Sequence, residues 1–146
     1  MEKFQRILMV EDSQNDIELI LDALSDHNFV NNIDVVRDGE EAMDYLYRRN
    51  TYKSRQAGNP IFILLDIKMP RMTGLELLRI IKQDEKMKTI PVIMLTSSRE
   101  DTDLRECYRL GVNAYVVKPV RFSDFADAVK KIGKFWAVVN EPPPEN

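Results

Sequence analysis

The sequence contains little that could cross-link the chain, anchor it in a membrane or build a metal site from imidazoles. One cysteine, Cys107, excludes an internal disulfide and favours a reducing compartment. One histidine, His27, is too few for a multi-histidine metal site or a catalytic triad. No apolar run approaches the roughly 20 residues of a membrane span, and the first residues lack the apolar stretch of a signal peptide. We therefore expect a cytoplasmic protein with no membrane partner.

An excess of positive charge is also lacking. The 146 residues include 21 Lys and Arg against 24 Asp and Glu, which gives a formal net charge of −3. Proteins that bind nucleic acid through phosphate contacts carry a basic face, so this balance argues against a nucleic-acid partner. Apolar residues make up 44% and charged residues 31% of the chain, an ordinary mixture for one soluble domain of this length.

Five short apolar runs recur along the chain and alternate with amphipathic stretches. They cover residues 7–10, 33–36, 61–65, 92–95 and 114–117. Each run is rich in Ile, Val and Leu, and most are continuous rather than alternating with polar residues. This pattern is typical of strands that are buried on both faces of a sheet.

The segments between these runs show helical spacing. Ile17, Ile20 and Leu24 fall on one face of a first helix, and residues 39–47 form a weaker second one. Gly111 stands where the fourth helix should end, because glycine readily adopts the left-handed conformation at a helix C-terminus. The fifth helix carries the longest apolar stripe, over residues 125–139.

Strict alternation of five strands and five helices predicts the fold. Parallel strands need crossover helices, and right-handed crossovers place those helices on both faces of the sheet. We expect an α/β fold of the flavodoxin-like kind, a doubly wound parallel sheet with strand order 2-1-3-4-5. The domain should cover residues 1–140, and residues 141–146, which include three consecutive prolines, should form a disordered tail.

Chemically reactive side chains follow the strands, at the sheet edge where such folds bind ligands. Glu11 and Asp12 follow the first strand and Asp66 the third, while Thr96 and Lys118 follow the fourth and fifth. Three clustered carboxylates repel one another unless a hard divalent cation such as Mg²⁺ joins them. The lysine and the hydroxyl then suit an additional anion, of which a phosphoryl group is the obvious candidate. A carboxylate can act as the nucleophile toward phosphorus.

Taken in order, these residues resemble the receiver domain of two-component response regulators over about residues 6–139. The resemblance rests on Glu11–Asp12, on the stretch from Asp66 to Gly74, on Thr96 and on Lys118-Pro119. It implies that Asp66 is the phosphoacceptor and that Asp12 ligates Mg²⁺ directly, with Mn²⁺ as a substitute. Glu11 would assist through water, and the backbone carbonyl of Lys68 would complete the metal ligands that the protein supplies.

The resemblance also assigns roles around the phosphoryl group. Thr96 would donate a hydrogen bond to a phosphoryl oxygen, and Lys118 would pair with the group. A cis peptide bond before Pro119 would aim the lysine into the site. Tyr115 matches the switch aromatic of the family, which turns inward when the hydroxyl residue moves toward the phosphate.

Two positions that vary among receivers are thought to tune dephosphorylation. They hold Lys68, two residues after the acceptor, and Ser98, two residues after Thr96. Neither offers a carboxylate or amide side chain to orient an attacking water. We therefore predict a fairly long-lived aspartyl phosphate.

Two surface segments raise the question of partners. Phe122, Phe135 and Trp136 are a large aromatic content for one helix, and in receivers the face of the fourth helix, fifth strand and fifth helix commonly carries dimer or output contacts. We therefore predict a homodimer through this face. Residues 48–60 hold four positive and no acidic side chains, and both a docking patch and a solvated loop remain open for them.

The hypothesis that follows is a stand-alone receiver, a phosphorylation-controlled switch rather than an enzyme. Only one helix and a tail follow Lys118-Pro119, too little for an output domain. A histidine kinase would donate the phosphoryl group, and signalling would use protein contacts with a downstream protein or a phosphotransfer protein. The long connection before the third strand and the extended last helix are similar to receivers that partner phytochrome-type kinases.

Four alternatives remain. The protein could be a phosphorelay intermediate, or a degenerate receiver that acts as a constitutive scaffold. A phosphatase of the haloacid dehalogenase kind would need a second aspartate where Lys68 stands. A flavodoxin-like electron carrier would need a loop rich in Ser, Thr and Gly where Glu11–Asp12 would repel the flavin phosphate.

Overall fold

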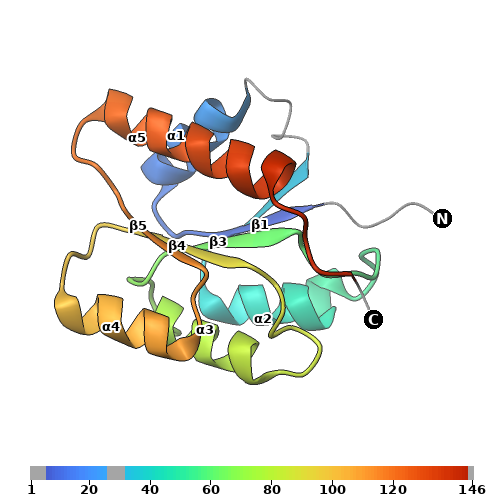
Figure 1. Ribbon diagram of the computed structural model, residues 1–146. Coiled ribbons are helices and arrows are strands. Elements are labelled where there is room, and N and C mark those ends of the chain that lie inside the picture. The colour runs from blue at the N-terminus through green and yellow to red at the C-terminus, as the bar shows by residue number, and fades with distance from the viewer. Residues whose placement is uncertain (1–5, 26–31, 145–146) are drawn as a thin grey trace.

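A five-stranded sheet forms the middle layer of the molecule in the computed structural model, which describes residues 6–25 and 32–144 (Figure 1). His27 lies outside the described residues. The strands are β1 (Ile7–Val10), β2 (Ile33–Val36), β3 (Phe62–Leu65), β4 (Val92–Thr96) and β5 (Ala114–Val117). All pairings are parallel, and the order is β2-β1-β3-β4-β5, which confirms the predicted fold. The third strand begins one residue later than predicted, and the fourth extends by one residue to Thr96.

Burial along the strands follows their place in the sheet. Every residue of the three central strands, β1, β3 and β4, is buried, because helices cover both faces there. The edge strands β2 and β5 are only partly buried. Continuous apolar runs are therefore found where both faces need apolar side chains, as the sequence pattern indicated.

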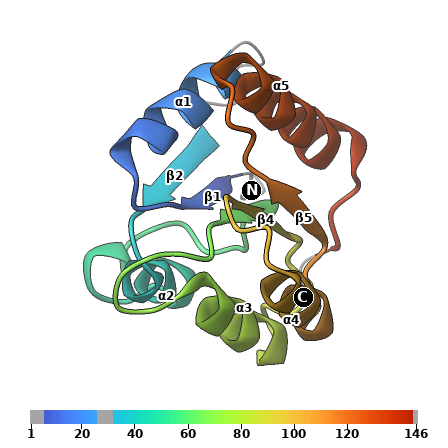
Figure 2. The ribbon, with the colours of Figure 1, turned by 90° about the vertical axis from the view of Figure 1, so that its left-hand side faces the viewer.

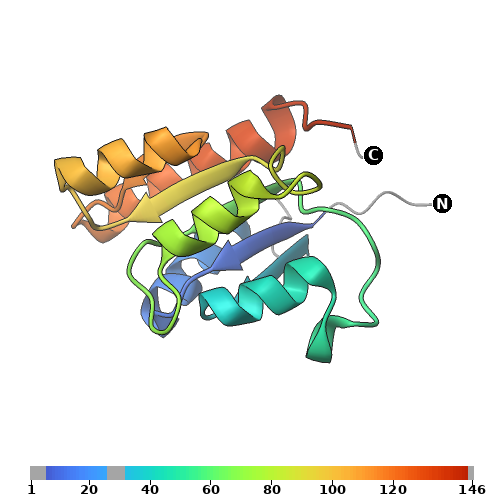
Figure 3. The same ribbon diagram turned by 90° about the horizontal axis from the view of Figure 1, so that it is seen from below.

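Five helices cover the sheet in two groups. The helices α1 (Gln14–Ser25) and α5 (Phe122–Gly133) pack on one face. On the other face α2 (Gly39–Tyr47), α3 (Gly74–Gln83) and α4 (Asp101–Leu110) lie side by side, as Figure 3 shows. The chain continues from α5 as a π-helix, η3 (Lys134–Val139), so the apolar stripe of the last helix stays helical to its end.

Local signals explain where several helices begin and end. The side chains of Asp38 and Thr73 accept hydrogen bonds from backbone N–H groups in the first turns of α2 and α3. Gly111 ends α4 in the left-handed conformation, with φ of 99°, which confirms its predicted role.

Two apolar cores lie on the two faces of the sheet. Ile17, Phe125 and Val129 belong to the core under α1 and α5. The core on the other face includes Leu77 and Cys107, so the free cysteine is a buried packing residue.

The basic connection of residues 48–60 contains a short 3₁₀-helix, η2 (Asn50–Tyr52). Arg55 lies over the ring of Tyr45, 4.3 Å from its centroid, and donates a hydrogen bond to the carbonyl oxygen of Tyr45. One of its four positive side chains is thus part of the fold, whereas Arg48, Arg49 and Lys53 are exposed. A docking role for the loop stays a prediction.

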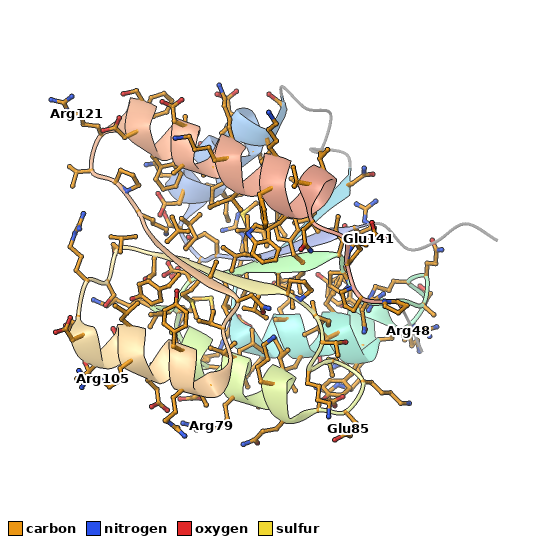
Figure 4. All side chains as sticks on the ribbon, in the orientation of Figure 1. Arg48, Arg79, Glu85, Arg105, Arg121 and Glu141 are labelled. Atoms are coloured by element: carbon orange, nitrogen blue, oxygen red, sulfur yellow. The ribbon has the colours of Figure 1, made fainter. Side chains whose placement is uncertain are left out.

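Charged side chains surround the molecule at both ends of the sheet. Arg105 and Arg121 lie at the end where the strands finish, and Arg48, Glu85 and Glu141 lie at the opposite end (Figure 4). Residues 141–144 form neither helix nor strand. Within the described residues, no helix combines the length and apolar character needed to cross a bilayer.

Candidate functional site

The sequence-predicted site residues meet at the edge of the sheet where the strands finish, the end that faces the viewer in Figure 2. Because β1 and β3 are neighbours, the residues that follow them come together. The backbone N–H of Asp66 donates to Val10 O at 3.2 Å, and that of Lys118 donates to Thr96 O at 2.7 Å. These bonds extend the strand pairing by one residue and fix where the two side chains leave the sheet.

Three carboxylates form a cluster at this edge. One oxygen each from Glu11, Asp12 and Asp66 lies within 4.8 Å of the others. Glu11 and Asp66 are buried and Asp12 is exposed. Buried carboxylates need a cation, and an all-oxygen donor set that is open to solvent on one side suits Mg²⁺, which keeps several waters. The residues present therefore fit a magnesium site.

A lysine ammonium already lies among these acids. Lys118 Nζ is 2.6 Å from Glu11 Oε1, 2.7 Å from Asp16 Oδ2 and 3.2 Å from Asp66 Oδ2. The fold thus places Lys118 in contact with Asp66, the residue that the sequence predicts as the phosphoacceptor. Asp16, in the first turn of α1, was not predicted. Its place in the first turn of the helix that follows the first strand, at the sheet edge where the other acids lie, is the signal that could have revealed it.

These contacts shift two pKa values. Burial raises the pKa of Glu11 to about 7, nearby Asp66 adds to the rise, and the hydrogen bond from Lys118 opposes it. Burial by itself would lower the pKa of Lys118. Its hydrogen bonds to Asp16 and Glu11 outweigh burial and raise that pKa above the ordinary value, so the ammonium is firmly charged.

Thr96 and Tyr115 are linked through the loop after β4. Thr96 is fully buried, and its hydroxyl accepts from the backbone N–H of Ser98 at 3.4 Å. The Tyr115 hydroxyl donates to the carbonyl oxygen of Ser98 at 3.0 Å. The Ser98 hydroxyl donates to Asp103 Oδ2 at 2.6 Å, so it is engaged with α4.

The prediction of a cis bond before Pro119 was wrong. Every peptide bond in residues 6–25 and 32–144 is trans. A trans bond is the intrinsically favoured form. The lysine needs no other isomer to reach the acids, because the bond from its own N–H to Thr96 O already directs Lys118 over the end of β4.

The segment after Asp66 is held close to it. The Lys68 N–H approaches Asp66 Oδ1 at 3.4 Å, and Arg71 adopts a positive φ of 65°. The Gly74 N–H donates to Ile67 O at 2.8 Å. A Cβ on Gly74 would lie only 2.1 Å from the carbonyl oxygen of Asp66, so glycine is required for this close approach.

The aromatic residues predicted to form a dimer surface lie in two places. Phe122 begins α5 and is 60% exposed. Phe135 is 48% exposed and makes an edge-to-face contact with Trp136, with ring centroids 5.1 Å apart. Trp136 packs partly against the core under α1 and α5. The two phenylalanines are thirteen positions apart, which corresponds to roughly 20 Å of helix, so the three rings form no single patch.

Comparison with known proteins agrees with this geometry. The sequence model of the response regulator receiver domain matches residues 7–130, and the chain belongs to this family. It is 36% identical over 130 residues to response regulator Rcp1 of Synechocystis, covering 89% of this chain and 87% of Rcp1. The Mn²⁺-bound form of response regulator Rcp1 superimposes with a TM-score of 0.89 at 34% identity, covering 96% of this chain and 99% of that one.

Two phytochrome-associated regulators are also similar. The phosphorylated cyanobacterial phytochrome response regulator RcpA is 38% identical, with a TM-score of 0.89. The match covers 96% of this chain and 99% of the RcpA chain. The bacteriophytochrome response regulator RtBRR is 51% identical, with a TM-score of 0.76. The match covers 96% of this chain and 84% of the RtBRR chain. The chain is therefore a receiver domain with structural relatives among phytochrome response regulators.

Proposed function

We propose that this protein is a stand-alone response regulator that accepts a phosphoryl group from a histidine kinase on Asp66, in a Mg²⁺-dependent reaction. The observation that carries the proposal is the meeting of the three-carboxylate cluster with Lys118, whose ammonium lies 3.2 Å from Asp66 Oδ2. The similarity of the chain to the response regulators RcpA and Rcp1 supports the proposal.

Each residue has a part in the transfer. An Asp66 oxygen forms a bond to phosphorus while the bond from phosphorus to the donor nitrogen or oxygen breaks, and the leaving group keeps that electron pair. Lys118 neutralises a phosphoryl oxygen, and Thr96 donates a hydrogen bond to another. Asp12, Asp66 and the backbone carbonyl of Lys68, with Glu11 assisting through water, would hold Mg²⁺, which would supply the remaining charge neutralisation. Mn²⁺ should substitute.

Incubation with acetyl phosphate and Mg²⁺, followed by intact mass measurement, tests the proposal. The protein should gain one adduct of about 80 Da, the mass of a phosphoryl group. The adduct should be absent in Asp66→Asn and after removal of the metal with EDTA. Absence of the adduct with every small-molecule and kinase donor would refute the proposal.

The aspartyl phosphate should be long-lived. The Ser98 hydroxyl is engaged with Asp103 at 2.6 Å, and the Lys68 side chain is exposed and carries no carboxylate or amide. Neither side chain is suited to orient an attacking water. A half-life of seconds, measured by mass spectrometry after removal of the donor, would contradict this.

The kinase is proposed to be of the phytochrome type, on the similarity to RcpA and RtBRR. Phosphotransfer from a panel of kinases that includes phytochrome-type members tests this, with the fastest transfer expected from those members. A relay role would instead show rapid onward transfer to a histidine phosphotransfer protein. A haloacid dehalogenase activity is disfavoured because Lys68 replaces the second aspartate.

Self-association through the face of α4, β5 and α5 remains part of the proposal. Exposed apolar side chains on this face support it, among them Tyr108 at 55% and Phe122 at 60%. Phe135→Ala is a suitable variant because Phe135 is half-exposed, whereas Trp136 packs partly against the core. Sedimentation should show weaker dimerisation of the variant, and identical profiles would exclude a role for Phe135.

A free, buried cysteine suits the cytoplasmic location that we also propose.

A further inference from the structure

Asp16 is a fourth carboxylate at the site, and it differs from the other three in what it touches. Its Oδ2 lies 2.7 Å from Lys118 Nζ, closer than Asp66 Oδ2 at 3.2 Å. It is not one of the three acids whose oxygens could share an ion. Its side chain therefore contacts the lysine and stands apart from the acid cluster.

The lysine has no spare hydrogen for a new partner. An ammonium has three N–H bonds, and Lys118 directs them to Glu11, Asp16 and Asp66. To bind a phosphoryl oxygen on Asp66, it has to release one carboxylate or weaken its bond to it.

Of the two partners other than the phosphoacceptor, Asp16 can be released more easily than Glu11. The Glu11 side chain is only 3% exposed, and its Oε2 accepts from the backbone N–H groups of Asp12 and Ser13 at 3.1 and 3.3 Å, which hold it in place. The Asp16 side chain is 25% exposed, so water can replace the lysine when the ion pair opens.

We propose, on the basis of the proposed phosphoacceptor function, that Asp16 restrains Lys118 in the unphosphorylated protein and competes with the phosphoryl group for its ammonium. Asp16 is a positioning residue that acts through Lys118. Its negative charge has opposite effects on the two ligands of the site, because it attracts Mg²⁺ and repels the phosphoryl group.

These opposite effects give the test its direction. Asp16→Asn should raise the Mg²⁺ dissociation constant about two- to fivefold and, at saturating Mg²⁺, speed phosphorylation by acetyl phosphate about threefold or more, as expected for removal of one charge from a half-solvated site. Calorimetric titration with Mg²⁺ measures the first quantity, and the rate of adduct formation measures the second. If the substitution merely disrupted the structure, Mg²⁺ affinity and phosphorylation rate would both fall.

Two control variants separate charge from position. Asp22→Asn removes the same charge from the same helix about 9 Å further along its axis, and both quantities should stay near wild type. Asp16→Glu keeps the charge, so Mg²⁺ affinity should stay within about twofold of wild type. Slower phosphorylation of Asp16→Asn, or unchanged Mg²⁺ affinity, would overturn the proposal. If the wild type itself forms no adduct, the phosphoacceptor function fails, and equal Mg²⁺ affinities of Asp16→Asn and Asp22→Asn would then overturn this inference separately.

Discussion

Replacing Gly74 with alanine should damage the site more than it damages the fold. Gly74 is buried at the first position of α3, directly beside the backbone of Asp66. A Cβ there would meet Asp66 O at 2.1 Å, and both Asp66 C and Ile67 Cα at 2.8 Å. All three are backbone atoms, so no side-chain rotation can relieve the contact, and the segment that carries the phosphoacceptor has to move.

The size of the effect follows from these distances. Relief to a normal contact requires a shift of about 1 Å, and a displacement of that size at reacting groups lowers rates by up to about 100-fold. Overpacking costs about 1–3 kcal/mol, and the helix preference of alanine returns at most about 1 kcal/mol. We expect Gly74→Ala to lower the free energy of unfolding by about 2 kcal/mol and the phosphorylation rate by about 10- to 100-fold.

Gly39 offers a matched control. It also occupies the first position of a buried helix start, in α2, behind a side-chain N-cap. The three atoms nearest to its added Cβ would be Cβ, Cγ and Sδ of Met72, at 2.6–2.8 Å. Rotation of the Met72 side chain can move Cγ and Sδ away, but relief at Cβ needs a small backbone shift at Met72, six residues along the chain from Asp66. Gly39→Ala should therefore cost about 1–3 kcal/mol in urea denaturation, as Gly74→Ala does, but lower the rate of adduct formation much less, because the backbone that moves is not that of Asp66. Equal effects of the two substitutions on the rate would refute the reasoning.

Three further substitutions test contacts outside the site. Tyr45→Phe removes a hydroxyl that donates to Asp34 Oδ2 at 2.5 Å, and urea denaturation should show a loss of about 1–2 kcal/mol; an unchanged midpoint would contradict this. Burial lowers the pKa of Lys82 from 10.5 to about 8, so the unfolded state binds more protons between these values and wild type gains stability as pH rises through them. Lys82→Met lacks this gain, so the unfolding free-energy difference between the two proteins should grow by about 1 kcal/mol over that window, and a constant difference would count against it. Gly111→Ala places a side chain at φ of 99° and should lower the melting temperature by several degrees, with a stability loss of about 1–2 kcal/mol.

Most of the fold could be predicted because the signals are local. The continuous apolar runs gave the strand positions to within one residue, since only strands covered on both faces need apolar residues at every position. Gly111 marked the end of α4 because few other residues adopt a left-handed cap. Strand order then brought Glu11, Asp12 and Asp66 together without further information.

The features that could not be predicted depend on contacts between distant residues. The Arg6 guanidinium donates twice to Asp34, 28 residues away, and the Tyr45 hydroxyl donates to the same carboxylate. No periodic pattern links those positions. The isomer before Pro119 was predicted wrongly because it was taken from the family resemblance, whereas it depends on the path of the surrounding chain. Asp16 escaped notice because an acid in the first turn of a helix has an ordinary explanation in the helix dipole.

Charge at the site suggests an order of events. Above pH 7, the carboxylates of Glu11, Asp12, Asp16 and Asp66 stand against one ammonium, that of Lys118, and the surplus negative charge repels an approaching phosphodonor. A divalent cation removes most of that surplus and leaves Lys118 free to exchange one carboxylate for a phosphoryl oxygen. Phosphorylation should therefore require Mg²⁺ to bind first, and the rate of adduct formation should rise with Mg²⁺ concentration and reach half of its maximum near the calorimetric dissociation constant. Adduct formation at an undiminished rate in EDTA would contradict this order.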